Sequence, residues 1–180
     1  LIAFTFLLNL FWIAPNIYFV LNHSKEVQNA NINLLFSESA FLKNKEFGDL
    51  FSLINLKTFY FDWSIYSQNQ FVELLSSYIT DMKVNILSLV LGIVWVLGLI
   101  IFVFKSKKTS LPILIPFALS TFFMINSNFP IAPIFDFLQS HFPLFKEALR
   151  FPQNKFLNQY IFFVSIFFGY FVLFLNTRFN

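Results

Sequence analysis

The stretch from Val84 to Phe104 reads VNILSLVLGIVWVLGLIIFVF and contains no charged residue. A helix needs about 20 apolar residues to cross a hydrocarbon core about 30 Å thick, so this stretch predicts a transmembrane helix. The composition favours the same conclusion, because hydrophobic residues make up 57% of the chain and charged residues only 12%. Soluble domains contain about 25% charged residues. The sequence therefore predicts a membrane protein.

Three further apolar stretches are long enough, or nearly so, to cross a bilayer: residues 1–21, 111–125 and 156–175. Only helices and closed barrels satisfy every backbone polar group in lipid, and barrel strands would alternate apolar and polar residues. We therefore predict an all-α fold, a polytopic helical membrane protein with about four transmembrane helices in a single domain over residues 1–180. Because the chain starts inside an apolar stretch, we interpret it as part of a longer protein.

The charge distribution predicts an orientation. Lys105, Lys107 and Lys108 lie in a short link, and short basic links remain in the cytoplasm. Residues 22–83 and 126–155 then form two ordered outer segments. These two segments hold all nine acidic residues and eight of the twelve basic residues, so the outer side carries a net charge of −1 and the inner side +4. We expect a multi-pass protein of a bacterial or archaeal plasma membrane.

The first outer segment is too apolar to be a disordered linker. Its spacing predicts an interfacial amphipathic helix over Glu46–Lys57. Four residues should face lipid or the membrane helices: Phe47, Leu50, Phe51 and Ile54. An interfacial aromatic belt is expected just after this helix, at Tyr60, Trp63 and Tyr66. Inside the apolar stretches, Asn9 and Asn85 are expected to donate hydrogen bonds between helices.

Several classes of site are not expected. The four glycines, at positions 48, 92, 98 and 169, form neither a dinucleotide-binding turn nor a phosphate-binding loop. The chain has no cysteine, and His23 and His141 belong to no metal-binding motif. We therefore expect no cofactor, no metal and no nucleic acid partner, and the lipid bilayer is the first partner to consider.

A group of cations, which we call the basic cluster, lies between the third and fourth apolar stretches. It consists of Lys146, Arg150 and Lys155, with Asn154 beside it. Lys146 and Arg150 are four residues apart and would share a helix face, and Pro152 is expected to end that helix. An Arg fork and mobile Lys charges suit a lipid phosphate. The alternative is that these residues are interfacial anchors whose charges reach the headgroups.

One acidic residue stands out near the basic cluster. Asp136 lies between two apolar pieces, close to Pro133, and is the best candidate for a catalytic acid in the second outer segment. An ordinary solvent-facing helix position is the competing interpretation for this residue.

Short phrases of the sequence resemble a known class of membrane enzymes. Asn9, Trp12 and Pro15 resemble a helix end in the GT-C glycosyltransferase class, with its YfhO-like and arabinofuranosyltransferase-like members. The phrase PLFKEALRFPQNKF resembles the outer loop that leads into a later membrane helix of those proteins. The matching residues are Pro143, Phe145, Arg150, Pro152, Lys155 and Phe156.

The resemblance implies transfer of a sugar from a polyprenyl-phosphate donor to a glycan or lipid acceptor at the outer face. In that class the catalytic carboxylate lies on the first outer loop, which implies that it lies outside this chain. Two other functions remain open at this stage. A transporter or flippase for an anionic lipid would use the same outer cations but would also need ionisable residues within its membrane helices. A non-catalytic scaffold subunit would need only packing and anchors.

Overall fold

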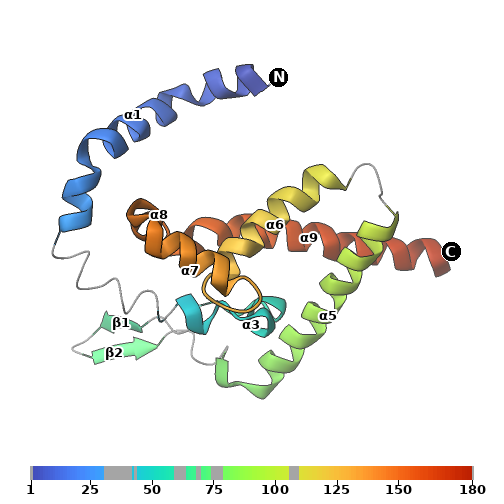
Figure 1. The fold of residues 1–180 in the computed structure, drawn as a ribbon. Coiled ribbons are helices and arrows are strands. Elements are labelled where there is room, and N and C mark those ends of the chain that lie inside the picture. Colours follow the sequence, from blue (N-terminus) through green and yellow to red (C-terminus); the bar gives the residue numbers. More distant parts are fainter. Residues whose placement is uncertain are drawn as a thin grey trace.

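The computed structural model describes residues 2–30, 42, 44–58, 64–67, 70–73, 79–105 and 110–179. The fold is mainly helical (Figure 1). The helices are α1 (Ile2–Asn29), α3 (Leu50–Ile54), α5 (Met82–Lys105), α6 (Leu111–Ile125), α7 (Ala132–His141), α8 (Pro143–Ala148) and α9 (Pro152–Phe179). A short antiparallel hairpin, β1 (Ser64–Ser67) and β2 (Gln70–Glu73), is also present, which the all-α prediction does not contain.

Two helices in the described part of the chain, α5 and α9, are long and apolar enough to cross a membrane. In each, only 22% of the most apolar window is buried within the molecule. Such exposure of apolar surface is typical of a lipid-facing helix, because a soluble protein would cover it. The apolar helix α6 is shorter, with 15 residues. Helix α1 extends past the predicted end at residue 21 to Asn29, through a polar last part that reads HSKEVQN.

Helices α5 and α9 run in the same direction. The side-chain contacts between them advance together along both helices: Trp95–Tyr160, Phe102–Phe167 and Lys105–Phe174. Their closest approach is at Gly98, where an added Cβ atom would clash with the backbone oxygen of Phe167. Helix α6 runs the opposite way along α9, because Phe117 contacts Phe167 whereas the later Phe123 stacks on the earlier Phe156. The three helices therefore alternate in direction.

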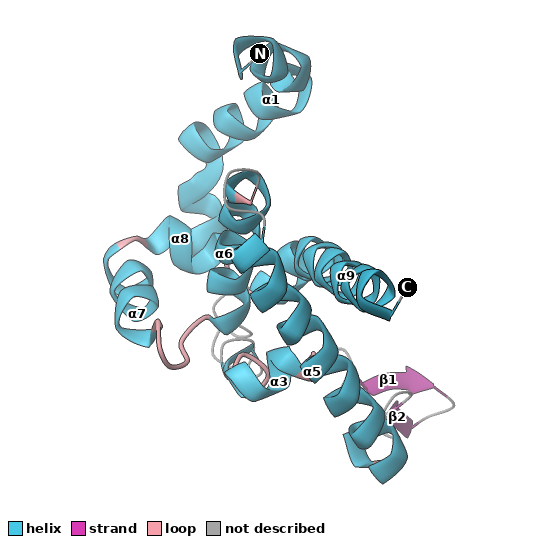
Figure 2. Cartoon of the chain, turned by 90° about the vertical axis from the view of Figure 1, so that its right-hand side faces the viewer, coloured by secondary structure: helices cyan, strands magenta, loops and turns pink. Residues whose placement is uncertain are grey.

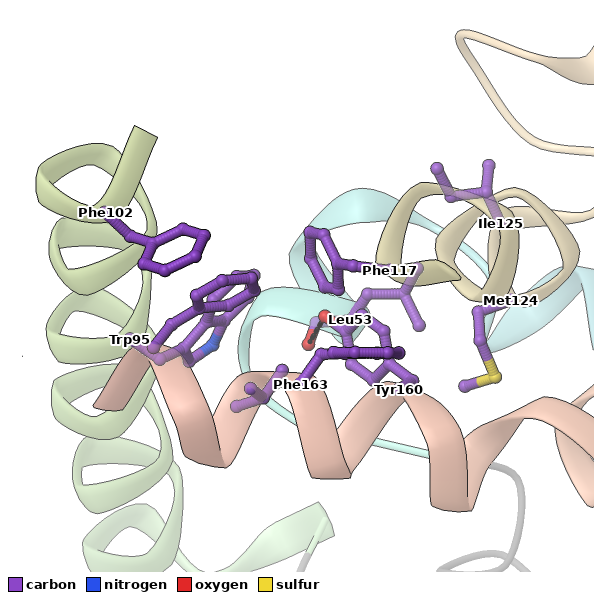
Figure 3. Packing of buried hydrophobic residues seen from close by; sticks show 10 residues of the cluster. Leu53, Trp95, Phe102, Phe117, Met124, Ile125, Tyr160 and Phe163 are labelled. Carbon is purple, nitrogen blue, oxygen red and sulfur yellow. Dashed lines mark hydrogen bonds between the residues drawn. The ribbon is translucent and has the colours of Figure 1, made fainter. Parts of the chain in front are cut away.

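The buried cluster lies where these three helices meet α3 (Figure 3). Trp95 contacts Phe117 edge-on, and Phe117 stacks on Tyr160 with ring centroids 5.8 Å apart. Such ring pairs contribute about 0.5–1.5 kcal/mol each beyond the area they bury. The whole cluster consists of Leu53, Trp95, Phe102, Phe117, Met124, Ile125, Tyr160, Phe163, Val164 and Phe167.

The predicted helix over Glu46–Lys57 is wrong in its length, whereas two of its four predicted face residues do pack inward: Phe47 is buried and Ile54 lies against the buried cluster. The chain is not helical at Phe47–Asp49, and α3 covers only Leu50–Ile54. Gly48 packs so closely against the end of α6 that a Cβ atom there would clash with Asn126. The buried residue of α3 is Leu53, whereas Phe51 is 64% exposed. The break at Gly48 therefore limits the helix to one short piece.

The backbone of residues 44–58, which we call the inserted segment, accepts hydrogen bonds at its end from two long helices. Tyr160 Oη donates to Leu53 O over 3.1 Å, and Trp95 Nε1 donates to Ile54 O over 2.9 Å. Ser88 Oγ donates to Asn55 O. The last carbonyl groups of any helix lack partners within that helix. At α3, the carbonyls of Leu53 and Ile54 accept from neutral side chains of α5 and α9, and the earlier carbonyls accept from backbone N–H groups of the following turn.

Amide side chains hold the beginning of the inserted segment. Asn126 Nδ2 donates to Asn44 O over 2.9 Å, and Asn128 Nδ2 donates to Lys45 O over 2.8 Å. Gln153 Nε2 donates to Phe47 O over 3.2 Å, and Gln153 is fully buried. Backbone polar groups that are buried away from water need such partners.

The remaining elements lie outside this cluster. Helix α1 stands apart from α5, α6 and α9 and contacts α8 (Figures 1 and 2). Tyr60 and Trp63 of the predicted aromatic belt lie outside the described residues, and Tyr66 lies in β1. Asn85 does not donate between long helices as predicted, because its Nδ2 donates to Ile79 O just before its own helix.

Candidate functional site

The basic cluster surrounds the turn between α8 and α9. Lys146 is exposed on α8, and Arg150 lies in the turn. Asn154 and Lys155 are exposed in the first turn of α9. The prediction that Pro152 ends a helix is wrong, because Pro152 is the first residue of α9. Proline suits this position, since the first N–H of a helix has no partner within the helix and the ring fixes φ near the helical value.

Lys155 joins the two helices of the turn. Its Nζ donates a hydrogen bond to the backbone oxygen of Ala148, the last residue of α8. The ammonium group therefore satisfies a carbonyl at the C-terminal end of α8, where the helix dipole favours a cation. Lys155 is exposed, so its remaining N–H groups can reach a ligand.

Arg150 is held through its backbone. Its carbonyl oxygen accepts a hydrogen bond from Asn44 Nδ2 over 2.6 Å, which joins the turn to the inserted segment. Its guanidinium carbon lies 5.9 Å from the centre of the Phe151 ring. Leu149 before it and Pro152 after it are buried. The backbone of Arg150 is thus fixed on both sides while its side chain is only half-buried.

The electrostatics of this turn favour an anion. Arg150 and Lys155 are close enough for their charges to repel one another. The N-terminus of α9, a helix of 28 residues, lies at the same place. Backbone N–H groups and the dipole at a helix N-terminus attract anions. A phosphate at this turn would relieve the repulsion between the two cations.

Asp136 lies on another helix, at an exposed position of α7. The preceding residue, Phe135, points into the molecule, where it contacts Phe145 with ring centroids 5.4 Å apart. Asp136 itself therefore faces away from the packed side of α7. It stays a prediction as a catalytic acid.

Sequence reasoning missed the residues that fix the turn. Asn44 and Gln153 hold it through hydrogen bonds that each span 106 residues. An isolated amide residue has no local pattern that predicts such a partner. The only available signal was the number of amide residues close to apolar stretches, where an amide without a partner would be costly.

Comparison of the chain with protein-family models, curated proteins and solved structures finds no match.

Proposed function

We propose that the chain is part of a membrane glycosyltransferase-like protein that uses a polyprenyl-phosphate-linked sugar at the outer membrane face. Arg150 and Lys155 bind the lipid phosphate, assisted by Lys146 and Asn154. The observation that carries the proposal is the position of the cations: Arg150 lies in the turn before α9 and Lys155 in the first turn of that helix, where its Nζ bonds the end of α8. The acceptor is a glycan or a lipid, and the catalytic acid is supplied from outside this chain or by Asp136.

The chemistry of the turn suits a phosphate monoester or diester. Arg offers a planar fork for two parallel hydrogen bonds, and Lys offers a mobile point charge. Because α9 continues as an apolar helix, the turn lies where a headgroup would lie above its hydrocarbon chain. A lipid-linked sugar fits this position, and it requires no nucleotide-binding loop.

A membrane orientation follows from the same proposal. The alternating directions of α5, α6 and α9 support three passes, with α1 as a fourth. The basic link at residues 105–108 then lies in the cytoplasm and the basic cluster lies outside. A transporter or flippase is less well supported, because the stretches 84–104, 111–125 and 156–175 contain no Asp, Glu, Lys, Arg or His.

Cysteine labelling tests the orientation. A Cys at Ser140 should react with a membrane-impermeant reagent added outside intact cells, whereas a Cys at Ser106 should react only after the membrane is opened. The native chain has no cysteine, so none of these 180 residues contributes background labelling. The reverse pattern would invert the orientation and place the basic cluster inside.

The phosphate site is tested by Arg150→Lys in the full-length protein, with transfer of a labelled lipid-linked sugar as the readout. Lys keeps the charge but loses the fork. We expect transfer to fall roughly tenfold to a hundredfold, which corresponds to a lost contact of about 1.5–3 kcal/mol.

Arg178→Lys is the matched control for that experiment. Arg178 is the other arginine of the chain, and its guanidinium lies 5.9 Å from the Phe174 ring, the same distance as Arg150 from Phe151. The control should keep full activity at equal protein level. Wild-type activity in both variants would contradict the phosphate site and leave the basic cluster as an anchor.

A further inference from the structure

An open groove of about 420 Å³ lies between the end of α3 and the beginning of α5. Phe51, Ile86 and Leu89 form its apolar part, and Asn55, Lys57 and Asn85 form its polar part. None of these six residues belongs to the basic cluster. The groove is therefore a separate feature of the molecule.

Lys57 brings a positive charge into this groove. The side chain is half-buried beside apolar residues. Within the ranges that the structure describes, its ammonium group forms neither a salt bridge nor a hydrogen bond. A partly buried ammonium loses water and needs an anion or an acceptor in return. The groove therefore favours an anionic ligand.

Asn55 and Asn85 bring two acceptors that have no donor among the described residues. The Oδ1 atom of each side chain is buried and accepts no hydrogen bond. The Nδ2 atoms donate to Phe51 O over 2.8 Å and to Ile79 O over 2.9 Å. These bonds fix the amide orientations, because a flipped amide would place oxygen against oxygen. Two buried acceptors thus favour a ligand that also donates hydrogen bonds.

The apolar part of the groove runs along α5. Ile86 and Leu89 follow Met82, the first residue of α5, by one and two helical turns. Phe51 and Ile86 are each more than half exposed. The groove therefore combines a cation with apolar side chains from the first turns of an apolar helix, and a membrane lipid likewise combines a charged headgroup with apolar chains.

We propose that this groove binds a phospholipid whose anionic headgroup carries hydroxyl groups. Lys57 contacts the phosphate, and the headgroup hydroxyls donate to Asn55 Oδ1 and Asn85 Oδ1. One acyl chain lies on Phe51, Ile86 and Leu89. Both amide oxygens are covered, so the hydroxyls reach them when the side chains that line the groove shift. The inference rests on the membrane placement proposed above and is independent of the sugar-transfer activity.

Three lipids test the two parts of this headgroup in turn. Phosphatidylglycerol has the charge and the hydroxyls, phosphatidylmethanol has the charge alone, and phosphatidylcholine has neither a net charge nor a hydroxyl. Native mass spectrometry of the purified protein in mixed micelles measures how much of each lipid it retains. We expect phosphatidylglycerol to be retained best, phosphatidylmethanol less, and phosphatidylcholine least. Equal retention of the three lipids by the wild type would overturn the proposal without any variant.

Lys57→Gln should weaken phosphatidylglycerol retention about tenfold or more, since it removes a charge-assisted contact. Lys83→Gln is the matched control, because Lys83 is exposed in the first turn of α5 and does not line the groove. Unchanged retention in Lys57→Gln, or an equal loss in both variants, would overturn the site.

Two further measurements complete the test. Glycerol 3-phosphate should not displace the lipid, and displacement at equal concentration would show an anion site with no role for the acyl chain. Lys57→Gln is also assayed for transfer of the labelled lipid-linked sugar by the full-length protein, which should be unchanged because Lys57 is not part of the basic cluster. Failure of the sugar-transfer proposal is then distinguishable from failure of this one.

Discussion

The carbonyl groups at the ends of two short helices, α3 and α8, accept hydrogen bonds from different kinds of side chain. In both helices, the last carbonyl groups lack partners within the helix. At α3 the carbonyls accept from neutral side chains, with Tyr160 Oη on Leu53 O and Trp95 Nε1 on Ile54 O. At α8 the carbonyl of Ala148 accepts from the ammonium group of Lys155.

The difference follows from burial. Leu53 and Tyr160 are each 2% exposed, and a charge at such a place would lose nearly all its hydration. Lys155 is exposed and keeps part of its water. The buried neutral donors therefore only stabilise the fold, whereas the exposed cation can stabilise the fold and also bind a ligand. We call the first arrangement the buried joint and the second the exposed joint.

The largest expected effect comes from pushing apart the helices that form the buried joint. Gly98→Ala places a Cβ atom against the backbone oxygen of Phe167, which cannot move without moving α9. We expect the free energy of unfolding to fall by about 3 kcal/mol. Gly169→Ala is the control, because a Cβ atom there meets nothing within 4 Å. Equal stability of the two variants in detergent would contradict the close approach of α5 and α9.

A smaller loss is expected from removing one donor of the buried joint. Tyr160→Phe keeps the ring and removes the hydrogen bond from Tyr160 Oη to Leu53 O, which still accepts from the backbone N–H of Leu56. The free energy of unfolding should fall by about 1–1.5 kcal/mol. Tyr18→Phe, at an exposed site on α1, should change it by less than about 0.5 kcal/mol. A neutral Tyr160→Phe would mean that α3 does not depend on this donor.

The smallest effect on stability is expected at the exposed joint. Lys155→Gln removes an exposed cation and should lower the free energy of unfolding by less than about 1 kcal/mol. Under the proposed function, the same variant should lose binding of a short-chain polyprenyl phosphate, measured by calorimetry in detergent. Lys25→Gln, at an exposed site near the end of α1, should change neither the free energy of unfolding nor the binding of polyprenyl phosphate. A large stability loss with intact phosphate binding would reverse the roles of the two joints.

Much of the helical framework could be predicted from apolar runs. Helix α6 begins at Leu111 and ends at Ile125, as predicted, and α5 extends the predicted range by two residues at its start and one at its end. These helices are fixed by local composition, since apolar runs of this length favour helix. The inserted segment could not be predicted in the same way, because the break at Gly48 depends on contact with Asn126, far along the chain.

In the candidate site, too, the features set by local sequence could be predicted and the features set by long-range contacts could not. Lys146, Arg150 and Lys155 are close in sequence, so their grouping could be predicted. The role of Pro152 could not, because a proline can either end one helix or begin another, and the local sequence does not decide between the two. The amide bonds of Asn44 and Gln153 are long-range and carry no local signal.

The buried joint also sets an order of events during synthesis. Leu53 leaves the ribosome 107 residues before Tyr160, its hydrogen-bond partner, and Trp95 follows Ile54 by 41 residues. Until α5 and then α9 have been made, the end of α3 lacks these side-chain donors, and Ile54 O needs water in place of Trp95 Nε1. Helix α3 is thus translated early, and its hydrogen bonds to α5 and α9 form late. A nascent chain that stops before α9 would hold this segment at the membrane surface, where its backbone still has water.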